Sequence, residues 1–411
     1  MELSRRSFLD LSALAAAARA LPAHAQTPHK GPPSPAEFKR RLVGPILSLP
    51  TVFDRSFAVD PRGLRGILTR GLRYRVPIFG LTAGNSLYQS LAYDEIKQVT
   101  KVMVETVAGR GLTIAATGDW WTGRAVDYCR YAEAVGAHAV QVLMPSRHGG
   151  DEMLVAHFEA IAKATRLPLV LHGRYSEPLL RKLLSIDSIV AMKEDAELTY
   201  YIDRQIEFGD RLSIFSGGAE NRFLVGFPYG AKAFFSTYTG FAPDISMRFW
   251  KAIQDNDLKK ATEVTTKYDY PFIKDFTHEF WHATLEYFGV AERYLRPPQR
   301  SYTDAEMKRV KEFFDTTHEA PQRHFDRRDP GRVARGSCGQ ATLRPDPGPG
   351  DRRRRLRPRR NRRLRRRLGC GADCPPRGTG ISNVVLVALR FEDGTRRDRT
   401  RDEPRRPELA A

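Results

Sequence analysis

The chain has 411 residues, of which 41% are hydrophobic, so it can bury one large core and is too apolar to be disordered throughout. Its net charge of +19 would suggest a nucleic-acid partner, but that charge is unevenly placed. Residues 26–320 carry 38 Lys+Arg against 35 Asp+Glu, whereas residues 321–411 carry 26 against 11. The composition of the larger part therefore gives no reason to expect nucleic-acid binding.

Residues 1–25 have the features of an export signal. Arg5 and Arg6 precede the apolar run 11–18, and Ala23-His24-Ala25 is a small-x-small cleavage pattern. An amphipathic first helix is the alternative. We expect a twin-arginine signal peptide at 1–25, a linker at 26–39 and a periplasmic location. The apolar run is too short to span a bilayer, and we expect no membrane partner.

Short apolar runs rich in β-formers recur along residues 40–318, and amphipathic segments follow them. Eight such runs over roughly 250 residues predict a (β/α)₈ TIM barrel, because strands that are apolar on both faces need helices around them. A doubly wound open sheet is the alternative fold. The predicted strands are Pro45–Phe53, Val76–Thr82, Leu112–Thr117, Ala137–Met144, Leu167–His172, Ile189–Lys193, Leu212–Ser216 and Ala231–Thr237.

The helices expected between these strands include Tyr93–Val107, Arg124–Val135, Met153–Thr165, Glu177–Ser185 and Glu197–Phe208. A helical C-terminal extension is predicted after the eighth unit, with helices at Ile245–Asn256, Leu258–Lys274, His278–Phe288 and Asp304–Phe314. The extension contains His278-Glu279-Phe280-Trp281-His282, which matches the H-E-x-x-H zinc motif. It lies far along the chain from any strand end and lacks a third ligand at the usual spacing. We expect no metal site.

The tail, residues 319–411, differs in composition from the barrel. Residues 321–411 hold 26 Arg and no Lys, with many Pro and Gly, a composition that predicts disorder. An anion- or nucleic-acid-binding tail is one explanation, and out-of-frame translation of GC-rich DNA is the other, favoured one. The run Ile381–Phe391 could form a strand.

Lys193 is unusual among the residues at the predicted strand ends, where the chemistry of such barrels collects. It follows the apolar run 189–192, so it should look into the barrel mouth. A desolvated lysine loses proton affinity, and its neutral amine attacks ketones to form imines. A structural lysine paired with Glu194 or Asp195 at the rim is the alternative. The spacing does not decide between them.

An ordered set of motifs from about Gly44 to Val310 resembles the dihydrodipicolinate synthase and N-acetylneuraminate lyase superfamily. The resemblance implies a lyase, a class I aldolase in which Lys193 forms a Schiff base with pyruvate or another 2-oxo acid. The motifs are Gly80-Leu81-Thr82-Ala83-Gly84-Asn85-Ser86, Ala115-Ala116-Thr117-Gly118, His157-Phe158, Leu167-Pro168, Met192-Lys193-Glu194, Phe215-Ser216-Gly217 and Arg296-Pro297-Pro298.

The resemblance also implies roles for individual residues. His172 stands where the family's proton-shuttling tyrosine is usual, so it is the second expected catalytic residue, although it could instead be a packed strand-end histidine. Ala83 replaces a loop threonine, and the family's other relay tyrosine is absent from the stretch 145–147. The expected substrate-binding residues are Thr82, Ala83, Gly84, Arg147, Arg174, Gly217 and Phe235.

These departures disfavour the lysine-synthesis reaction and leave the substrate open. A non-catalytic periplasmic 2-oxo-acid binding protein is the alternative function. We expect a small-molecule 2-oxo acid as ligand, no cofactor, no nucleic acid bound to the barrel, and a homo-oligomer, either dimer or tetramer.

Overall fold

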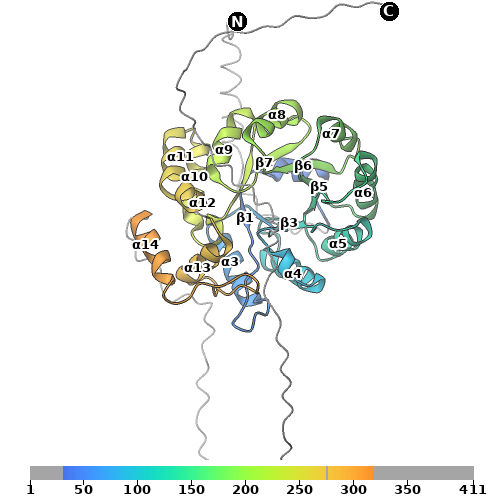
Figure 1. Cartoon of the computed structure of the whole chain (residues 1–411). Coiled ribbons are helices and arrows are strands. Elements are labelled where there is room, and N and C mark those ends of the chain that lie inside the picture. The colour runs from blue at the N-terminus through green and yellow to red at the C-terminus, as the bar shows by residue number, and fades with distance from the viewer. Residues whose placement is uncertain (1–30, 275, 318–411) are drawn as a thin grey trace, which may run out of the picture. The chain divides into compact units, whose positions relative to one another are not determined.

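The computed structural model describes residues 31–274 and 276–317. Eight parallel strands form one closed barrel in which each strand pairs with its neighbours in sequence and β8 pairs with β1 (Figure 1). The predicted TIM barrel is confirmed. The strands are β1 Gly44–Ser48, β2 Ile78–Gly80, β3 Leu112–Ala116, β4 Ala139–Leu143, β5 Leu169–His172, β6 Ile189–Glu194, β7 Ser213–Ser216 and β8 Ala233–Ser236.

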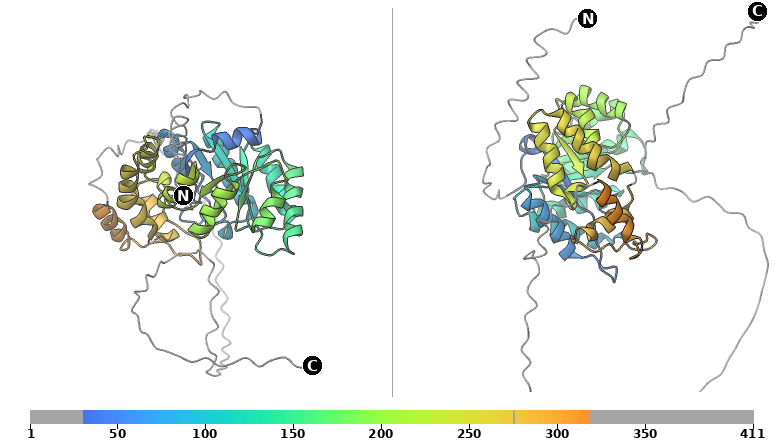
Figure 2. Two further views of the ribbon diagram at one scale, coloured as in Figure 1. Left: turned by 90° about the horizontal axis from the view of Figure 1, so that it is seen from above. Right: turned by 90° about the vertical axis from the view of Figure 1, so that its left-hand side faces the viewer.

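Helices surround the strands and cover the outer face of the closed sheet (Figures 1 and 2). Every predicted helix between strands is present, with its ends moved by at most two residues, and α3 and α9 were not among those predicted. These helices are α3 Pro61–Arg73, α4 Tyr93–Val107, α5 Thr122–Ala134, α6 Asp151–Ala164, α7 Glu177–Leu183, α8 Leu198–Phe208, α9 Glu220–Gly226 and α10 Pro243–Gln254.

An additional helix, α2 (Pro35–Arg41), precedes β1. The Ser34 hydroxyl caps it by accepting a hydrogen bond from the Glu37 amide at 3.2 Å. Phe38 and Leu42 are fully buried in the cluster that fills the barrel interior. The segment that we expected to be a linker, residues 26–39, therefore includes the larger part of α2.

The interior of the barrel is filled by alternate residues of the strands, because successive side chains of a strand point to opposite faces. Val170 of β5, Ala191 of β6 and Phe235 of β8 belong to this interior cluster. His172 and Lys193 each follow an interior residue by two positions, at the C-terminal ends of β5 and β6. The strand period thus directs both side chains toward the mouth of the barrel.

The pairing of β5 with β6 contains a register shift. Leu169 is level with Ile189, but the next residue of β5, Val170, is level with Ala191. One residue of β6 is passed over, as in a β-bulge. From there on His172 is level with Lys193.

The helical extension departs from the prediction at one point. The expected helix Leu258–Lys274 is divided into α11 (Leu258–Val264), a π-helical turn (Thr265–Asp269) and α12 (Tyr270–Lys274). Pro271 explains the division, because proline has no amide hydrogen and its ring clashes with the carbonyl four residues earlier in a regular helix. Helices α13 (His278–Tyr287) and α14 (Met307–Thr317) complete the extension.

The π-helical turn connects the extension to the barrel through Asp269. Its Oδ2 accepts hydrogen bonds from the amides of Glu220 at 2.9 Å and Asn221 at 3.4 Å, at the start of α9. The Glu220 carboxyl is fully buried and accepts a hydrogen bond from the Ser236 hydroxyl at 3.1 Å. Two acidic side chains are therefore enclosed near the ends of β7 and β8.

Within residues 31–274 and 276–317, no helix is both long enough and apolar enough to cross a bilayer. The predicted signal peptide, the first five residues of the expected linker, the tail and its candidate strand Ile381–Phe391 lie outside the described residues.

Candidate active site

Lys193 is the centre of the candidate site. Although it is a lysine, only 7% of its surface is exposed. Its ammonium group donates a hydrogen bond to Asp195 Oδ2 and lies 3.2 Å from His172 Nε2. Of the two rim carboxylates considered as partners from the sequence, Asp195 is the one that pairs with Lys193. The Lys193 side chain is thus buried, as expected for a Schiff-base lysine, and it is also paired with a carboxylate, as expected for a structural lysine.

His172 is held at both ring nitrogens. Its Nε2 lies 3.0 Å from Asp195 Oδ2, and its Nδ1 lies 3.2 Å from the amide nitrogen of Gln141, which is fully buried on β4. Burial and the positive charge of Lys193 lower the pKa of His172, although the contact with Asp195 acts in the opposite direction. A neutral imidazole, able to accept a proton, is favoured beside the lysine.

Asp195 completes a group of three side chains. Desolvation would raise the pKa of Asp195, but the charge of Lys193 and the hydrogen bond with His172 outweigh it and hold the pKa far below its usual value. The Asp195 side chain is 44% exposed, whereas that of Lys193 is 8% exposed. Solvent therefore reaches the ion pair from the carboxylate side.

Glu194, between Lys193 and Asp195 in sequence, faces away from them, as the alternation of a strand requires. Its buried carboxylate forms an ion pair with Arg222, whose guanidinium also donates to the Ala196 carbonyl at 2.5 Å. Burial raises the pKa of Glu194 despite this pairing. Glu194 stabilises the start of the loop after β6 through Arg222, and it does not belong to the contact group of Lys193, His172 and Asp195.

Gly217 and Phe235, both expected to bind substrate, lie beside the lysine. A Cβ atom on Gly217 would lie 2.8 Å from Lys193 Nζ and would overlap the Asp195 carboxylate. The Phe235 ring centroid is 5.6 Å from the same Nζ, a cation–π distance. The space for the Lys193–Asp195 pair therefore depends on a missing side chain at position 217.

The loop after β2 contains three of the residues expected to bind substrate, Thr82, Ala83 and Gly84. Thr82 is buried, and its hydroxyl accepts a hydrogen bond from the Asn85 amide at 3.2 Å. Ser86 ties this loop to β1 by donating to the Leu49 carbonyl at 2.7 Å. Within the described residues, the amides of Ala83 and Gly84 have no hydrogen-bond acceptor. Their N–H groups are available to a carboxylate, as expected for a cradle.

The two arginines expected at the mouth differ in their surroundings. Arg174 is exposed, forms an ion pair with Glu197 and lies over the Tyr200 ring at 4.9 Å. Arg147 is exposed on the loop after β4 and, among the residues that the structure describes, forms no ion pair or hydrogen bond. Neither arginine belongs to the contact group of Lys193, His172 and Asp195.

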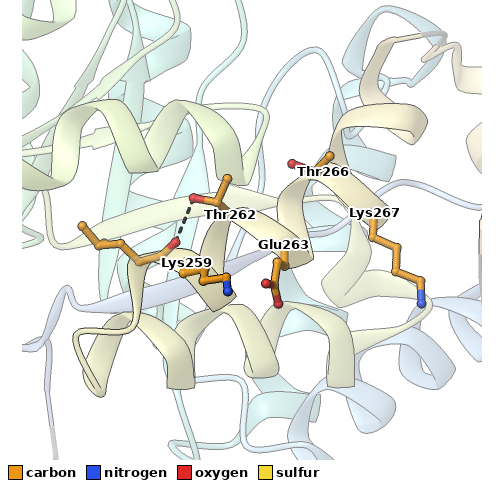
Figure 3. A pocket seen from close by; sticks show the side chains of 6 residues that line it. Lys259, Thr262, Glu263, Thr266 and Lys267 are labelled. Atoms are coloured by element: carbon orange, nitrogen blue, oxygen red, sulfur yellow. Dashed lines mark hydrogen bonds between the residues drawn. The ribbon is translucent and has the colours of Figure 1, made fainter.

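Two other features lie apart from this group. A surface hollow of the helical extension is lined by residues of α11 and the π-helical turn, including Lys259, Glu263 and Lys267, and by no residue from a strand end (Figure 3). His278 and His282 lie one turn apart on α13, and His282 is fully buried, with no hydrogen-bond partner for either ring nitrogen among residues 31–274 and 276–317. Across the described part of the chain, no cluster of three or more His, Cys, Asp or Glu could hold a metal.

A family model described as "Dihydrodipicolinate synthetase family" matches residues 49–316, which include the barrel from β2 to β8 and nearly all of the helical extension. The chain belongs to the dihydrodipicolinate synthetase family. The resemblance inferred from the ordered motifs is confirmed, and so is the expectation that the chain is an enzyme of this lyase family.

The chain is similar to proteins that are named after different activities. A Methylobacterium radiotolerans protein named "Probable 5-dehydro-4-deoxyglucarate dehydratase" is 29% identical over 253 residues, 58% of this chain and 82% of that protein. A solved dihydrodipicolinate synthase from Bacillus clausii has a TM-score of 0.62 at 20% identity, covering 68% of this chain and 99% of its own. A Mycoplasma synoviae N-acetylneuraminate lyase also has a TM-score of 0.62, at 22% identity, with coverages of 68% and 99%. The two solved structures support the fold.

The sequence interpretation missed Gln141 and gave Asp195 no catalytic role. Gln141 carried a signal, since it is the single polar residue in the apolar strand Ala139–Leu143. Asp195 carried none beyond its position, because a carboxylate two residues after a strand-end lysine is also typical of a solvated rim. Only the contacts with Lys193 and His172 distinguish it.

Proposed function

We propose that this enzyme is a Schiff-base lyase in which Lys193 condenses with the ketone of a 2-oxo acid. The observation that carries the proposal is the burial of Lys193 at the C-terminal end of β6, in contact with His172. The protonated imine withdraws electrons from the adjacent carbon, so a proton or a carbon group can leave that carbon. His172 is the base and acid that moves this proton. The loop amides of Ala83 and Gly84 would hold the substrate carboxylate.

Within this class, we propose that the enzyme dehydrates a hydroxylated 2-oxo acid that carries a second acidic group. Relatives named as 5-dehydro-4-deoxyglucarate dehydratases support this substrate class. Arg147 and Arg174 supply positive charge on the loops after β4 and β5, where a second carboxylate would lie. Lysine-pathway synthesis fits less well, because His172 and Arg147 occupy the stretches where the family resemblance implies two relay tyrosines.

Borohydride reduction tests the proposed chemistry, because it converts an imine into a stable secondary amine. The purified protein should gain the mass of a reduced adduct with pyruvate or a longer 2-oxo acid, and peptide mapping should place the adduct on Lys193. Lys193→Ala should abolish the adduct, whereas Lys163→Ala, at an exposed position of α6, should leave it unchanged. Binding of 2-oxo acids without an adduct would instead support the non-catalytic binding protein.

We also propose export by the twin-arginine route, on the basis of Arg5, Arg6 and the cleavage pattern at 23–25. Fractionation of cells expressing the full chain should recover the protein from the periplasm. Replacing Arg5 and Arg6 together by Lys should retain it in the cytoplasm, and an unchanged distribution would contradict this location. The oligomeric state stays a prediction, to be measured by light scattering.

A further inference from the structure

One carboxylate oxygen lies between the two groups that handle protons in the candidate site. Asp195 Oδ2 accepts a hydrogen bond from Lys193 Nζ and lies 3.0 Å from His172 Nε2, and these two nitrogens are 3.2 Å apart. The three atoms form a closed triangle. Asp195 directly follows β6, and the absence of a side chain at Gly217 leaves room for its carboxylate.

We infer that Asp195 is the fixed counter-ion of a positive charge that passes between Lys193 and His172 during the reaction. The inference rests on the proposed Schiff-base function and adds a catalytic residue to it. Asp195 touches the reacting nitrogen, so its role is direct. Asp195 is an addition to the residues to which the family resemblance gives a role, and the role of each of those residues stays the same.

The charge balance of imine formation supports this role. The ammonium group of Lys193 and the ketone give a protonated imine and one water molecule, whose two hydrogens both come from the lysine nitrogen. His172 Nε2 relays the protons between that nitrogen and the departing oxygen. The nitrogen carries one positive charge before and after the reaction. Asp195 therefore has a cation beside it in both states, and no charge is left unpaired.

The charge moves in the next step. When His172 Nε2 takes a proton from the carbon adjacent to the imine, the electron pair of that C–H bond neutralises the nitrogen and leaves an enamine, while the ring becomes an imidazolium. The cation has passed from Lys193 to His172, and both are in contact with the same Asp195 oxygen. In a dehydration, the imidazolium then gives the proton to the departing hydroxyl group, which leaves as water. A preplaced counter-ion stabilises each state without rearrangement.

Gln141 allows the tautomer that this step needs. His172 can accept a proton at Nε2 only when its hydrogen is on Nδ1, the nitrogen facing the Gln141 amide. The amide oxygen of Gln141 is buried and has no partner within the described residues. A half-turn of the amide would present that oxygen to Nδ1–H. In this tautomer Nε2 carries no hydrogen, so it accepts a hydrogen bond from Lys193 Nζ and donates one to Asp195 Oδ2 only after it has taken up the proton.

The test uses pyruvate, whose methyl protons exchange with deuterium on the enzyme through the enamine, and the exchange rate of pyruvate without protein is subtracted. Asp195→Asn keeps the shape of the side chain and removes its charge, and Asp187→Asn, in the turn before β6, is the matched control. Two quantities are measured in the full-length protein, the borohydride adduct on Lys193 and the deuterium exchange rate as a function of pH. Thermal unfolding of both variants verifies that they are folded.

We expect Asp195→Asn to retain the adduct but to slow deuterium exchange by about 10²-fold or more. The acid limb of its pH profile should move to lower pH by roughly one unit, because removing the carboxylate weakens proton binding by His172. Asp187→Asn should match the unchanged protein in both measurements. Lys193 and His172 are the titratable groups in contact with Asp195, since Glu194 is directed to Arg222.

Two results would overturn the role of Asp195. In one, exchange in Asp195→Asn stays within about twofold of the unchanged protein, with the same acid limb. In the other, adduct and exchange fall in parallel with no shift of the limb, which indicates a purely structural role. Failure of the unchanged protein to form any adduct with any 2-oxo acid would instead remove the proposed function itself.

Discussion

Arg296 binds Glu95 through two parallel hydrogen bonds of 2.7 and 2.6 Å, which join segments 201 residues apart in the chain. The same guanidinium donates to the carbonyls of Phe57 and Ser90 at 2.7 and 2.8 Å and lies over the Phe53 ring at 4.7 Å. The segment after α13 is thereby fastened to the loops after β1 and β2.

Arg296→Ala should lower the free energy of unfolding by about 3 kcal/mol, because a carboxylate and two carbonyls lose a charged donor. Urea denaturation followed by circular dichroism measures this change. Arg300→Ala, which removes an ion pair with Glu306 whose arginine is 63% exposed, is the control and should cost much less, because water screens exposed ion pairs. Equal losses for the two variants would contradict the importance of the burial of Arg296 and of its contacts with the two carbonyls.

Glu220 should make the protein less stable as the pH rises. Burial raises its pKa to about 7, and burial together with the nearby Glu220 raises that of Asp269. A carboxyl group whose pKa is higher in the folded than in the unfolded protein stabilises the fold while it is protonated. This contribution is complete at pH values below the unfolded-state pKa, near 4.3, and is lost as the pH rises through the folded-state pKa.

Glu220→Gln should therefore stabilise the protein at pH 8 by up to about 3 kcal/mol and change little at pH 4. The amide oxygen of glutamine can still accept the hydrogen bond from Ser236. Melting temperatures at both pH values measure the difference. Glu105→Gln, at an exposed position of α4, should have no pH-dependent effect. A gain from Glu220→Gln that is equal at both pH values would argue against titration as its cause.

Gly217→Ala should slow Schiff-base formation by Lys193 with little change to the rest of the fold. The added methyl group would overlap the Asp195 carboxylate and lie 2.8 Å from Lys193 Nζ, so the pair would have to separate. We expect the rate of adduct formation to fall on the order of 10²-fold, as a misplacement of about 1 Å can cause. Gly240→Ala, whose new carbon would meet only atoms at 3.9 and 4.0 Å, is the control. Adduct formation at the normal rate would show that this contact does not constrain Lys193.

His282→Leu should leave the adduct intact and should not lower stability at neutral pH. The histidine is fully buried with both nitrogens unpartnered, and burial lowers its pKa to about 3. Because this pKa lies below the unfolded value near 6.5, the histidine costs stability progressively as the pH falls from 6.5 toward 3. The variant should therefore gain most over the unchanged protein at about pH 4, measured by urea denaturation. Stoichiometric zinc that disappears in this variant would revive the metal-site alternative for α13.

The strands of the barrel were predictable because apolar runs of β-forming residues mark them directly. Lys193 was predictable for a related reason, since a charged residue that ends such a run stands out. Helix α2 was not predicted, because its seven residues have no clear period and its role depends on Phe38 and Leu42 fitting the barrel interior. The π-helical turn was missed because the prediction gave no weight to Pro271.

The sequence predicted which strand ends form the candidate site, but it did not predict the contacts between their side chains. Thr82, His172, Lys193 and Gly217 lie at or just after the C-terminal ends of four different strands, and the fold alone brings those ends to one edge. Which side chains then touch depends on rotamers and on the register of each strand pair. The sequence therefore indicated His172 and Lys193 separately, but not their contact with Asp195.

The residue that β6 passes over in its pairing with β5 decides which neighbour Lys193 has. With an unbroken count from Leu169 and Ile189, His172 would stand beside Met192, and the residue beside Lys193 would be Gly173, which has no side chain. Without the register shift, the present sequence would thus separate the imidazole from the amine while every catalytic residue type remained. The register shift between β5 and β6, together with the residue types, therefore determines which side chain exchanges protons with Lys193.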